Sequence, residues 1–227
     1  MELSDALRTT GSIRDFTDEP IGDELLYAVL DDARFAPSGG NRQSWRVIVV
    51  HDASLRHQIR DQYLDAWHDY VGHRLAGLIP FSPLATVGER AAAQSQRRAA
   101  EALSTPEGFA ESLDTVPAML VVCANLEVLA ATDRDLARYH LVGGASVYPF
   151  VWNILLAARE RGLGGVMTTV ATRNEEKVRG ILSIPANHAV ASIVALGHPA
   201  KRHTKLTRRR VEEFTTVDAF DGRALNA

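Results

Sequence analysis

Apolar residues recur along this chain with two spacings, one typical of amphipathic helices and one typical of buried strands. The helical spacing predicts helices over residues 3–9, 23–34, 53–78, 134–161 and 174–182. Short unbroken apolar runs predict strands over residues 45–50, 119–123, 166–170 and 189–196. Because helices separate the strands throughout, we expect an α/β or α+β sandwich.

Two segments depart from this simple alternation. Residues 134–161 form the longest expected helical unit, in which Pro149 either kinks the helix or begins a second one. The small residues 143–146 suit either ordinary core packing or a subunit interface. Prolines and glycines flank an alanine- and arginine-rich helical stretch, residues 89–103, whose apolar face is thin. We therefore expect one domain over residues 1–227 with a surface insertion or lid at about 80–115.

Composition narrows the class of partner. With 227 residues and 46% hydrophobic residues the chain can bury a substantial core. A net charge of −3 argues against nucleic-acid or membrane-surface binding and favours a small-molecule partner. We expect neither a membrane span nor a targeting segment. The single cysteine, Cys123, is expected to be a small buried residue in a cytoplasmic, reducing compartment.

Several common chemistries have no motif here. No strand is followed by Gly-x-Gly-x-x-Gly, and no Walker loop occurs. The eight histidines are dispersed, so we expect no metal site. Adjacent carboxylates such as Asp31 and Asp32 point apart on a helix and do not form an acid/base pair. Ser38 lacks the setting of a catalytic serine.

The loop at residues 36–45 is the strongest positive signal. Two adjacent glycines allow positive φ and close approach to a ligand, and Ser38, Asn41 and Gln43 add short polar groups. Arg14 near the N-terminus and the basic tail that ends at Arg210 are suited to an anionic group such as phosphate. The simpler alternatives to a binding role are that the segment around Arg14 only connects two elements and that the basic tail is only solvated. Together, the three segments predict a cofactor site.

Four segments, at residues 12–16, 36–45, 155–164 and 195–199, resemble motifs of the nitroreductase superfamily in their order and spacing. The resemblance covers nearly the whole chain except about 80–115. It implies an α+β fold with a central, mostly antiparallel sheet flanked by helices. It also implies a homodimer that binds FMN at the subunit interface with residues from both chains.

The resemblance assigns the cofactor-binding residues position by position. Those expected to bind FMN are Ser12, Ile13, Arg14, Pro37, Ser38, Gly39, Asn41, Gln43, Thr168, Thr169 and Arg208. This chain departs from the usual family motif at two places, where relatives commonly carry two arginines and a proline. Thr10 and Gly11 replace two arginines before Ser12, and Ser44 replaces the proline after Gln43. Arg209 or Arg210 is a candidate to supply the missing positive charge.

The function implied is an FMN-dependent oxidoreductase without a catalytic side chain, because the flavin carries the chemistry. NADH or NADPH would reduce it, and an electron-poor acceptor such as a nitroaromatic or quinone would follow in a ping-pong mechanism. The same fold also suits dehalogenation, enone reduction or flavin breakdown. Flavin storage without turnover and a deazaflavin cofactor in place of FMN are further alternatives.

Overall fold

The computed structural model describes residues 1–103 and 108–226. In these ranges one sheet has the strand order β1-β2-β4-β3, and every neighbouring pair is antiparallel. The strands are β1 (Trp45–Val49), β2 (Ala118–Asn125), β3 (Gly164–Thr168) and β4 (His188–Gly197). The expected fold class, α+β with a central antiparallel sheet, is confirmed.

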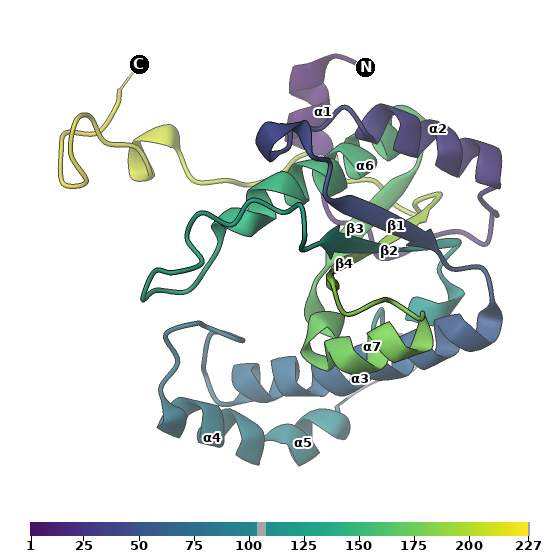
Figure 1. Cartoon of the computed structure of the whole chain (residues 1–227), viewed down its shortest axis with the longest axis horizontal. Helices are drawn as coiled ribbons and strands as arrows, with labels where there is room; N and C mark the ends of the chain where they lie inside the picture. The colour runs from purple at the N-terminus through teal and green to yellow at the C-terminus, as the bar shows by residue number, and fades with distance from the viewer. Residues whose placement is uncertain (104–107, 227) are drawn as a thin grey trace.

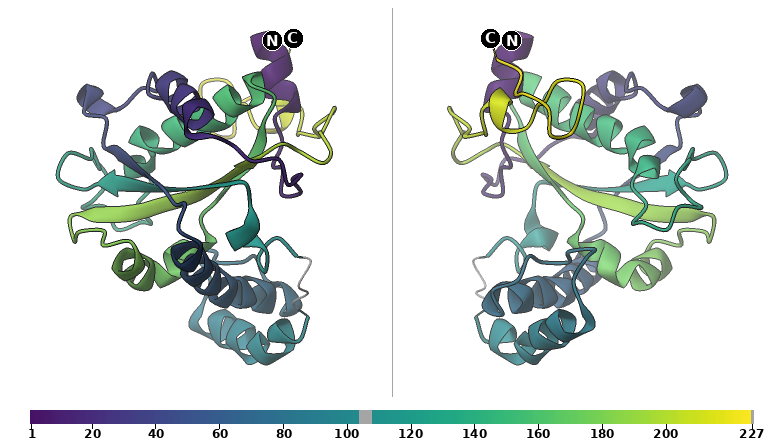
Figure 2. Two further views of the ribbon diagram at one scale, coloured as in Figure 1. Left: turned by 90° about the vertical axis from the view of Figure 1, so that its right-hand side faces the viewer. Right: turned by 90° about the vertical axis from the view of Figure 1, so that its left-hand side faces the viewer.

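Helices cover both faces of the sheet (Figure 1). The α-helices are α1 (Leu3–Thr9), α2 (Asp23–Ala33), α3 (Ala53–Leu75), α4 (Val87–Ser95), α5 (Arg97–Glu101), α6 (Tyr148–Glu160) and α7 (Glu175–Ile181). The 3-10 turns are η1 (Gly39–Asn41), η2 (Leu113–Thr115), η3 (Val142–Ser146), η4 (Val170–Asn174) and η5 (Val211–Glu213). Figure 2 shows the sheet edge-on between α2 and α6 on one side and α3 and α7 on the other.

The central strand β2 contributes to both halves of the core. Successive side chains of a strand point to opposite faces, so Leu120 and Val122 pack with α2 and α6, whereas Met119 and Val121 pack with α3 and α7. Because both faces are covered, this strand is apolar at every position from Ala118 to Ala124 rather than at alternate ones. Cys123 is buried in the second cluster, as the sequence predicts.

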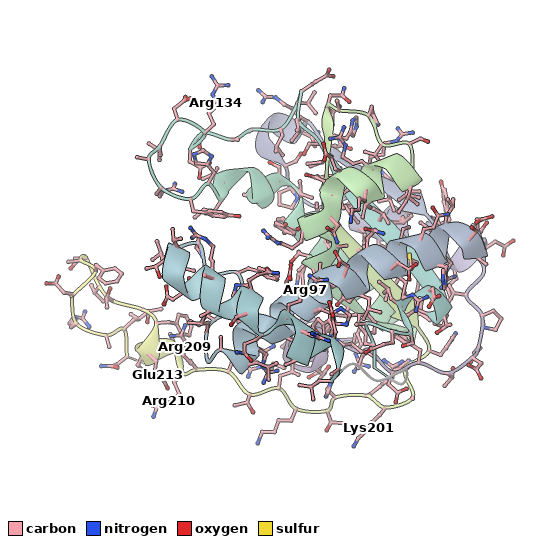
Figure 3. The ribbon with its side chains drawn as sticks, turned by 90° about the horizontal axis from the view of Figure 1, so that it is seen from below. Arg97, Arg134, Lys201, Arg209, Arg210 and Glu213 are labelled. Carbon is pink, nitrogen blue, oxygen red and sulfur yellow. The ribbon has the colours of Figure 1, made fainter. Side chains whose placement is uncertain are left out.

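Helices α4 and α5 form a further layer outside α3. A Cβ atom on Gly72 of α3 would lie 2.8 Å from the carbonyl oxygen of Ala93, so only glycine allows α4 to approach this closely. Arg97 of α5 pairs with Asp69 of α3 at 2.6 Å and also with Asp65. Figure 3 shows Arg97 where α5 meets α3. The expected helix at 89–103 is thus two helices, α4 and α5, which meet at Gln96.

The expected helical unit at 134–161 is wrong in its first half. Residues 126–147 form turns and η3, and the helix begins only at Tyr148, with Pro149 in its first turn. The buried carboxylate of Asp133 accepts hydrogen bonds from the backbone N–H groups of Leu141 at 2.8 Å and Val142 at 3.2 Å. These bonds close a loop and compete with helical ones. At 23 residues, α3 is longer than α6.

The third strand lies two residues earlier than the apolar run 166–170 predicts. β3 begins at Gly164 and ends at Thr168, and the chain then turns into η4. Gly164 and Gly165 pair with Gly197 and Leu196 of β4. A Cβ atom on Gly165 would lie 2.6 Å from the carbonyl oxygen of Ala195, so this glycine permits the close pairing of the two strands.

Candidate functional site

Residues 12–14 add a short extended segment to the outer edge of β3. The backbone N–H of Ile13 donates to the carbonyl of Gly165 at 2.9 Å, and Ser12 forms a parallel bridge with Gly165. Ile13 is buried against Gly164, where a Cβ atom would lie 2.9 Å from the Ile13 side chain. This packing orients the neighbouring Arg14 side chain toward α3.

Arg14 and Thr168 line one cavity of about 550 Å³. Its other walls come from α3, from Ala100 and Leu103, from residues 108–111 and from Val170. Aromatic side chains dominate these walls: Tyr63, Trp67, Tyr70 and Phe109. The Arg14 guanidinium lies 5.9 Å from the centre of the Phe109 ring. The cavity therefore combines flat apolar surfaces with a cation at its edge.

The aromatic wall on α3 is a stack of three rings. The centroids of Tyr63 and Trp67 are 6.4 Å apart, and those of Trp67 and Tyr70 are 4.8 Å apart. Phe109 meets Tyr63 edge-on at 6.1 Å. The spacing of the three α3 rings, four and then three residues apart, places them along one side of the helix. The sequence analysis named none of these four aromatic residues as site residues.

Thr168 connects the end of β3 to this wall. Its hydroxyl donates to the hydroxyl of Tyr63 at 3.2 Å. Burial raises the pKa of Tyr63, while the hydrogen bond with Thr168 and the charge of Arg14 act in the opposite direction. The next residue, Thr169, is exposed and lines a second cavity that adjoins the first.

The predicted cradle at residues 36–45 is an exposed loop between α2 and β1. Positive φ angles occur at Gly40 (61°), Asn41 (53°) and Gln43 (49°), a conformation that is uncommon for the last of these. The Ser38 hydroxyl accepts from the Gln43 backbone N–H at 2.9 Å, and Gly39 N–H donates to Ser146 Oγ at 3.0 Å. Side-chain hydrogen bonds thus hold the loop in a strained shape, which is typical of ligand-binding segments.

Within the described chain, this loop and the Arg14 cavity lie apart. The loop leads into β1 and the cavity adjoins β3, and these strands are the opposite edges of the sheet. The loop follows α2 on one face, whereas the cavity is lined by α3 on the other. The structure brings Arg14 and Thr168 together with the aromatic wall, but it does not bring Pro37, Ser38, Gly39, Asn41 or Gln43 to them.

The basic tail begins against the body of the protein and then leaves it. Arg202 donates to the carbonyls of Gly162 and Leu163, and His203 contacts the carbonyl of Ser12. The last part of the chain, in yellow in Figure 1, then extends away from the sheet. Arg208 is exposed and donates to the carbonyl of the preceding residue at 2.8 Å. It is not part of the Arg14 cavity in this chain.

Three comparisons with known proteins bear on this geometry. A family model described as the nitroreductase family matches residues 7–198. The chain belongs to the nitroreductase family. An NADH dehydrogenase of Thermus thermophilus is 29% identical over 196 residues, which cover 84% of this chain and 83% of the relative. A 5,6-dimethylbenzimidazole synthase of Rhodospirillum rubrum is 28% identical over 199 residues, covering 84% and 79%.

Solved structures support the same fold. A crystal structure of oxidized iodotyrosine deiodinase bound to FMN and 3-iodo-L-tyrosine superposes with a TM-score of 0.65 at 23% identity, covering 96% of this chain and 100% of that one. Nitroreductase family membership and the relatives' names support an oxidoreductase. The family includes relatives with different reactions, so membership alone does not specify the acceptor.

None of the helices in the described ranges combines the length and apolar character that crossing a bilayer requires. Across the same residues, no group of three or more His, Cys, Asp or Glu side chains is arranged to hold a metal ion.

Proposed function

We propose that this protein is an FMN-dependent oxidoreductase that uses NADH or NADPH to reduce an electron-poor acceptor in a ping-pong mechanism. The observation that carries the proposal is the position of Arg14 at the edge of a cavity with aromatic walls. Family membership and a relative named as an NADH dehydrogenase support the same conclusion.

The chemistry of this cavity suits a phosphorylated planar ring. Within the described ranges Arg14 forms no ion pair, so its guanidinium is free to hold a phosphate, and the Ser12 and Thr168 hydroxyls lie on adjacent backbone segments. Trp67, Tyr70 and Phe109 supply aromatic surface against which a tricyclic ring can pack. Ser12, Ile13, Arg14, Thr168 and Thr169 form one half of the proposed FMN site.

The other half is proposed to come from a second copy of the chain. The loop with Pro37, Ser38, Gly39, Asn41 and Gln43 lies on the opposite edge and face of the sheet, so one copy cannot place both halves on one ligand. A symmetric homodimer satisfies this requirement because each copy lends its loop to the other.

Exposed apolar side chains support this dimer. Around η3 and α6, Tyr139 is 72% exposed and Leu141 is 67% exposed, and Trp152 is also exposed. On the tail, Phe214 and Phe220 are exposed as well. Large apolar groups gathered on a surface are typical of an interface. The small residues 143–146, which suit either core packing or an interface, lie in this region.

Arg208 is proposed to complete the phosphate site from the tail. Arg209 and Arg210 are the two candidates to replace the positive charge that Thr10 and Gly11 lack. Arg210 already forms an ion pair with Glu212 at 3.3 Å. Arg209 forms no ion pair within the described residues and is the better candidate. Figure 3 shows both arginines on the tail beside Glu213.

FMN, when bound, supplies the hydride-transfer chemistry that amino-acid side chains lack. The chain's residues bind the phosphate, orient the ring and admit donor and acceptor in turn to one cavity. We propose that the described part of residues 80–115, which supplies α4 and α5, acts as a lid that sets the identity of the acceptor; residues 104–107 lie outside the described ranges. Sharing one cavity between donor and acceptor gives ping-pong kinetics.

An anaerobic titration tests the proposal. The purified protein is incubated with FMN, freed of unbound cofactor and titrated with NADH or NADPH while the visible flavin absorbance is followed. We expect a yellow protein whose absorbance bleaches with at least one donor and recovers with a nitroaromatic or quinone. Protein that takes up no flavin contradicts the proposal. Protein that binds flavin but resists both donors favours flavin storage or another donor.

Complementation between two variants tests the shared site. Arg14→Ala and Ser38→Ala each damage a different half, so each homodimer is expected to bind FMN weakly. A heterodimer formed by co-expression carries one site with both defects and one intact site. We therefore expect tight binding to return in half of its sites, measured by quenching of FMN fluorescence. A protein that is monomeric by light scattering yet binds FMN tightly would contradict the dimer.

A further inference from the structure

A second cavity of about 840 Å³ adjoins the aromatic one, and Tyr70 and Val170 line both. Its walls come from the C-terminal half of α3, from α4 with residues 80–85, and from η4. It therefore lies between the proposed lid and the turn that follows Thr168. A molecule that packs beside FMN at this junction can extend directly into the second cavity.

The charged side chains of the second cavity are mostly cationic. The cations Arg90 on α4 and Arg173 on η4 face it, together with the carboxylate of Asp69 and the imidazole of His73. The charge of Asp69 is already offset, because Arg97 pairs with it at 2.6 Å. Across the described ranges, neither Arg90 nor Arg173 forms an ion pair with a carboxylate. The cavity thus has an uncompensated positive charge.

Contacts with neighbouring groups hold these side chains in place. The guanidinium of Arg173 lies 5.1 Å from the centre of the Phe81 ring, and the His73 ring lies 5.0 Å from the same ring. His73 Nδ1 lies 2.8 Å from the carbonyl oxygen of Asp69, and this contact orients the imidazole ring. Arg90 donates to the carbonyl of Ala85 and keeps further N–H groups free.

We propose that the second cavity binds the carboxylate or phosphate of an aromatic compound whose ring packs beside the bound FMN, where the two cavities meet. Two guanidinium groups without carboxylate partners, at the wall of a partly enclosed space, are the donors that such anions require. This inference rests on the proposed function and narrows its substrate to an anionic one. The anion belongs either to the acceptor or to the phosphates of the nicotinamide donor.

Steady-state kinetics with matched acceptors test the inference. Para-nitrobenzoate and para-nitrobenzyl alcohol have the same ring and nitro group, but only the first is an anion. We expect the KM for nitrobenzoate to be about tenfold lower than that for the alcohol, which corresponds to about 1.4 kcal/mol. Arg173→Gln and Arg90→Gln are expected to raise the KM for nitrobenzoate and leave the alcohol unchanged. Arg98→Gln, an exposed α5 arginine that lines neither cavity, is the control.

Kinetics with NADPH show whether the bound anion belongs to the acceptor or to the nicotinamide donor. If the two variants raise the KM for NADPH and leave both nitro compounds unaffected, the cavity binds the donor's phosphate. Binding of nitrobenzoate to the FMN-loaded protein, followed by tryptophan fluorescence because Trp67 lines the first cavity, gives a readout independent of turnover. An active enzyme whose variants treat every anion like the wild type overturns this inference. Absence of flavin binding or reduction refutes the proposed function instead.

Discussion

The hydroxyl of Thr168 donates a 3.2 Å hydrogen bond to the hydroxyl of Tyr63, which ties the end of β3 to the middle of α3. Both residues line the aromatic cavity, so this bond fixes one of its corners. Tyr63 is almost fully buried, at 2% exposure. A polar contact in such a place is costly to break, because a buried hydroxyl left without its partner loses both water and protein bonds.

Tyr63→Phe tests this contact. The variant keeps the ring and its packing but removes the acceptor for Thr168. We expect the free energy of unfolding to fall by about 1 kcal/mol. Urea denaturation measures the change, and Tyr27→Phe is the control because Tyr27 is 74% exposed. Equal effects of the two substitutions would show that the bond contributes nothing specific.

Gly165 is tightly surrounded and Gly180 is not, so the same substitution to alanine is expected to have opposite effects on stability at the two positions. A Cβ atom on Gly165 would lie 2.5 Å from Leu196 Cδ2 and 2.6 Å from the carbonyl of Ala195, whereas a Cβ atom on Gly180 meets nothing within 4 Å. Gly165→Ala is expected to destabilise the protein by about 1–3 kcal/mol. Gly180→Ala in α7 is expected to stabilise it by about 0.5–1 kcal/mol, because alanine favours a helix. Thermal unfolding of both variants gives the signs, and a stabilising Gly165→Ala would contradict the strand pairing described here.

The ion pairs of Arg97 are predicted to hold the lid against α3. Arg97 contacts Asp65 and Asp69 of α3, so Arg97→Gln removes the charged link between α5 and that helix. We expect cleavage within residues 87–103 to become about fivefold faster, the effect of roughly 1 kcal/mol on local opening. Limited proteolysis with mass spectrometry measures it. Arg134→Gln, which removes an ion pair with Asp135 between two exposed side chains, is expected to leave this rate unchanged.

Asp133 is predicted to make stability depend on acid pH. The backbone N–H groups of Leu141 and Val142, together with Arg138, lower the pKa of its carboxyl to about 2, against an unfolded value of about 3.9. Because the folded pKa is the lower one, the stabilisation is fully present above about pH 4 and is lost as the pH falls toward about 2.

The variant Asp133→Asn is expected to lower the Tm by about 3 °C at neutral pH and to flatten its decline between about pH 4 and pH 2. Asp135→Asn, at an exposed neighbouring position, is expected to leave the decline intact. Thermal unfolding at several pH values makes the comparison. A wild-type Tm that is flat over this range would contradict the role of Asp133.

The spacing of apolar and polar residues predicted many of the helices and strands, because these elements depend on interactions between residues close together in the chain. Asp52 caps α3 by accepting from Leu55 N–H at 2.8 Å, and the apolar run around Val121 forms a strand buried on both faces. The misplaced start of α6 has a different cause. Asp133 bonds to backbone groups eight and nine residues away, and helical periodicity carries no signal for such a bond.

The sequence by itself determined the helices and strands with strong periodicity, the polar loop around Ser38 and the family motif at Arg14. Tertiary structure alone decided which of these residues meet. It placed Phe109 and Tyr63 around Arg14 and set the Ser38 loop on the opposite edge of the sheet. The physical reason is that spacing along the chain governs backbone conformation and the face a side chain takes, whereas proximity between distant segments depends on how the whole core packs.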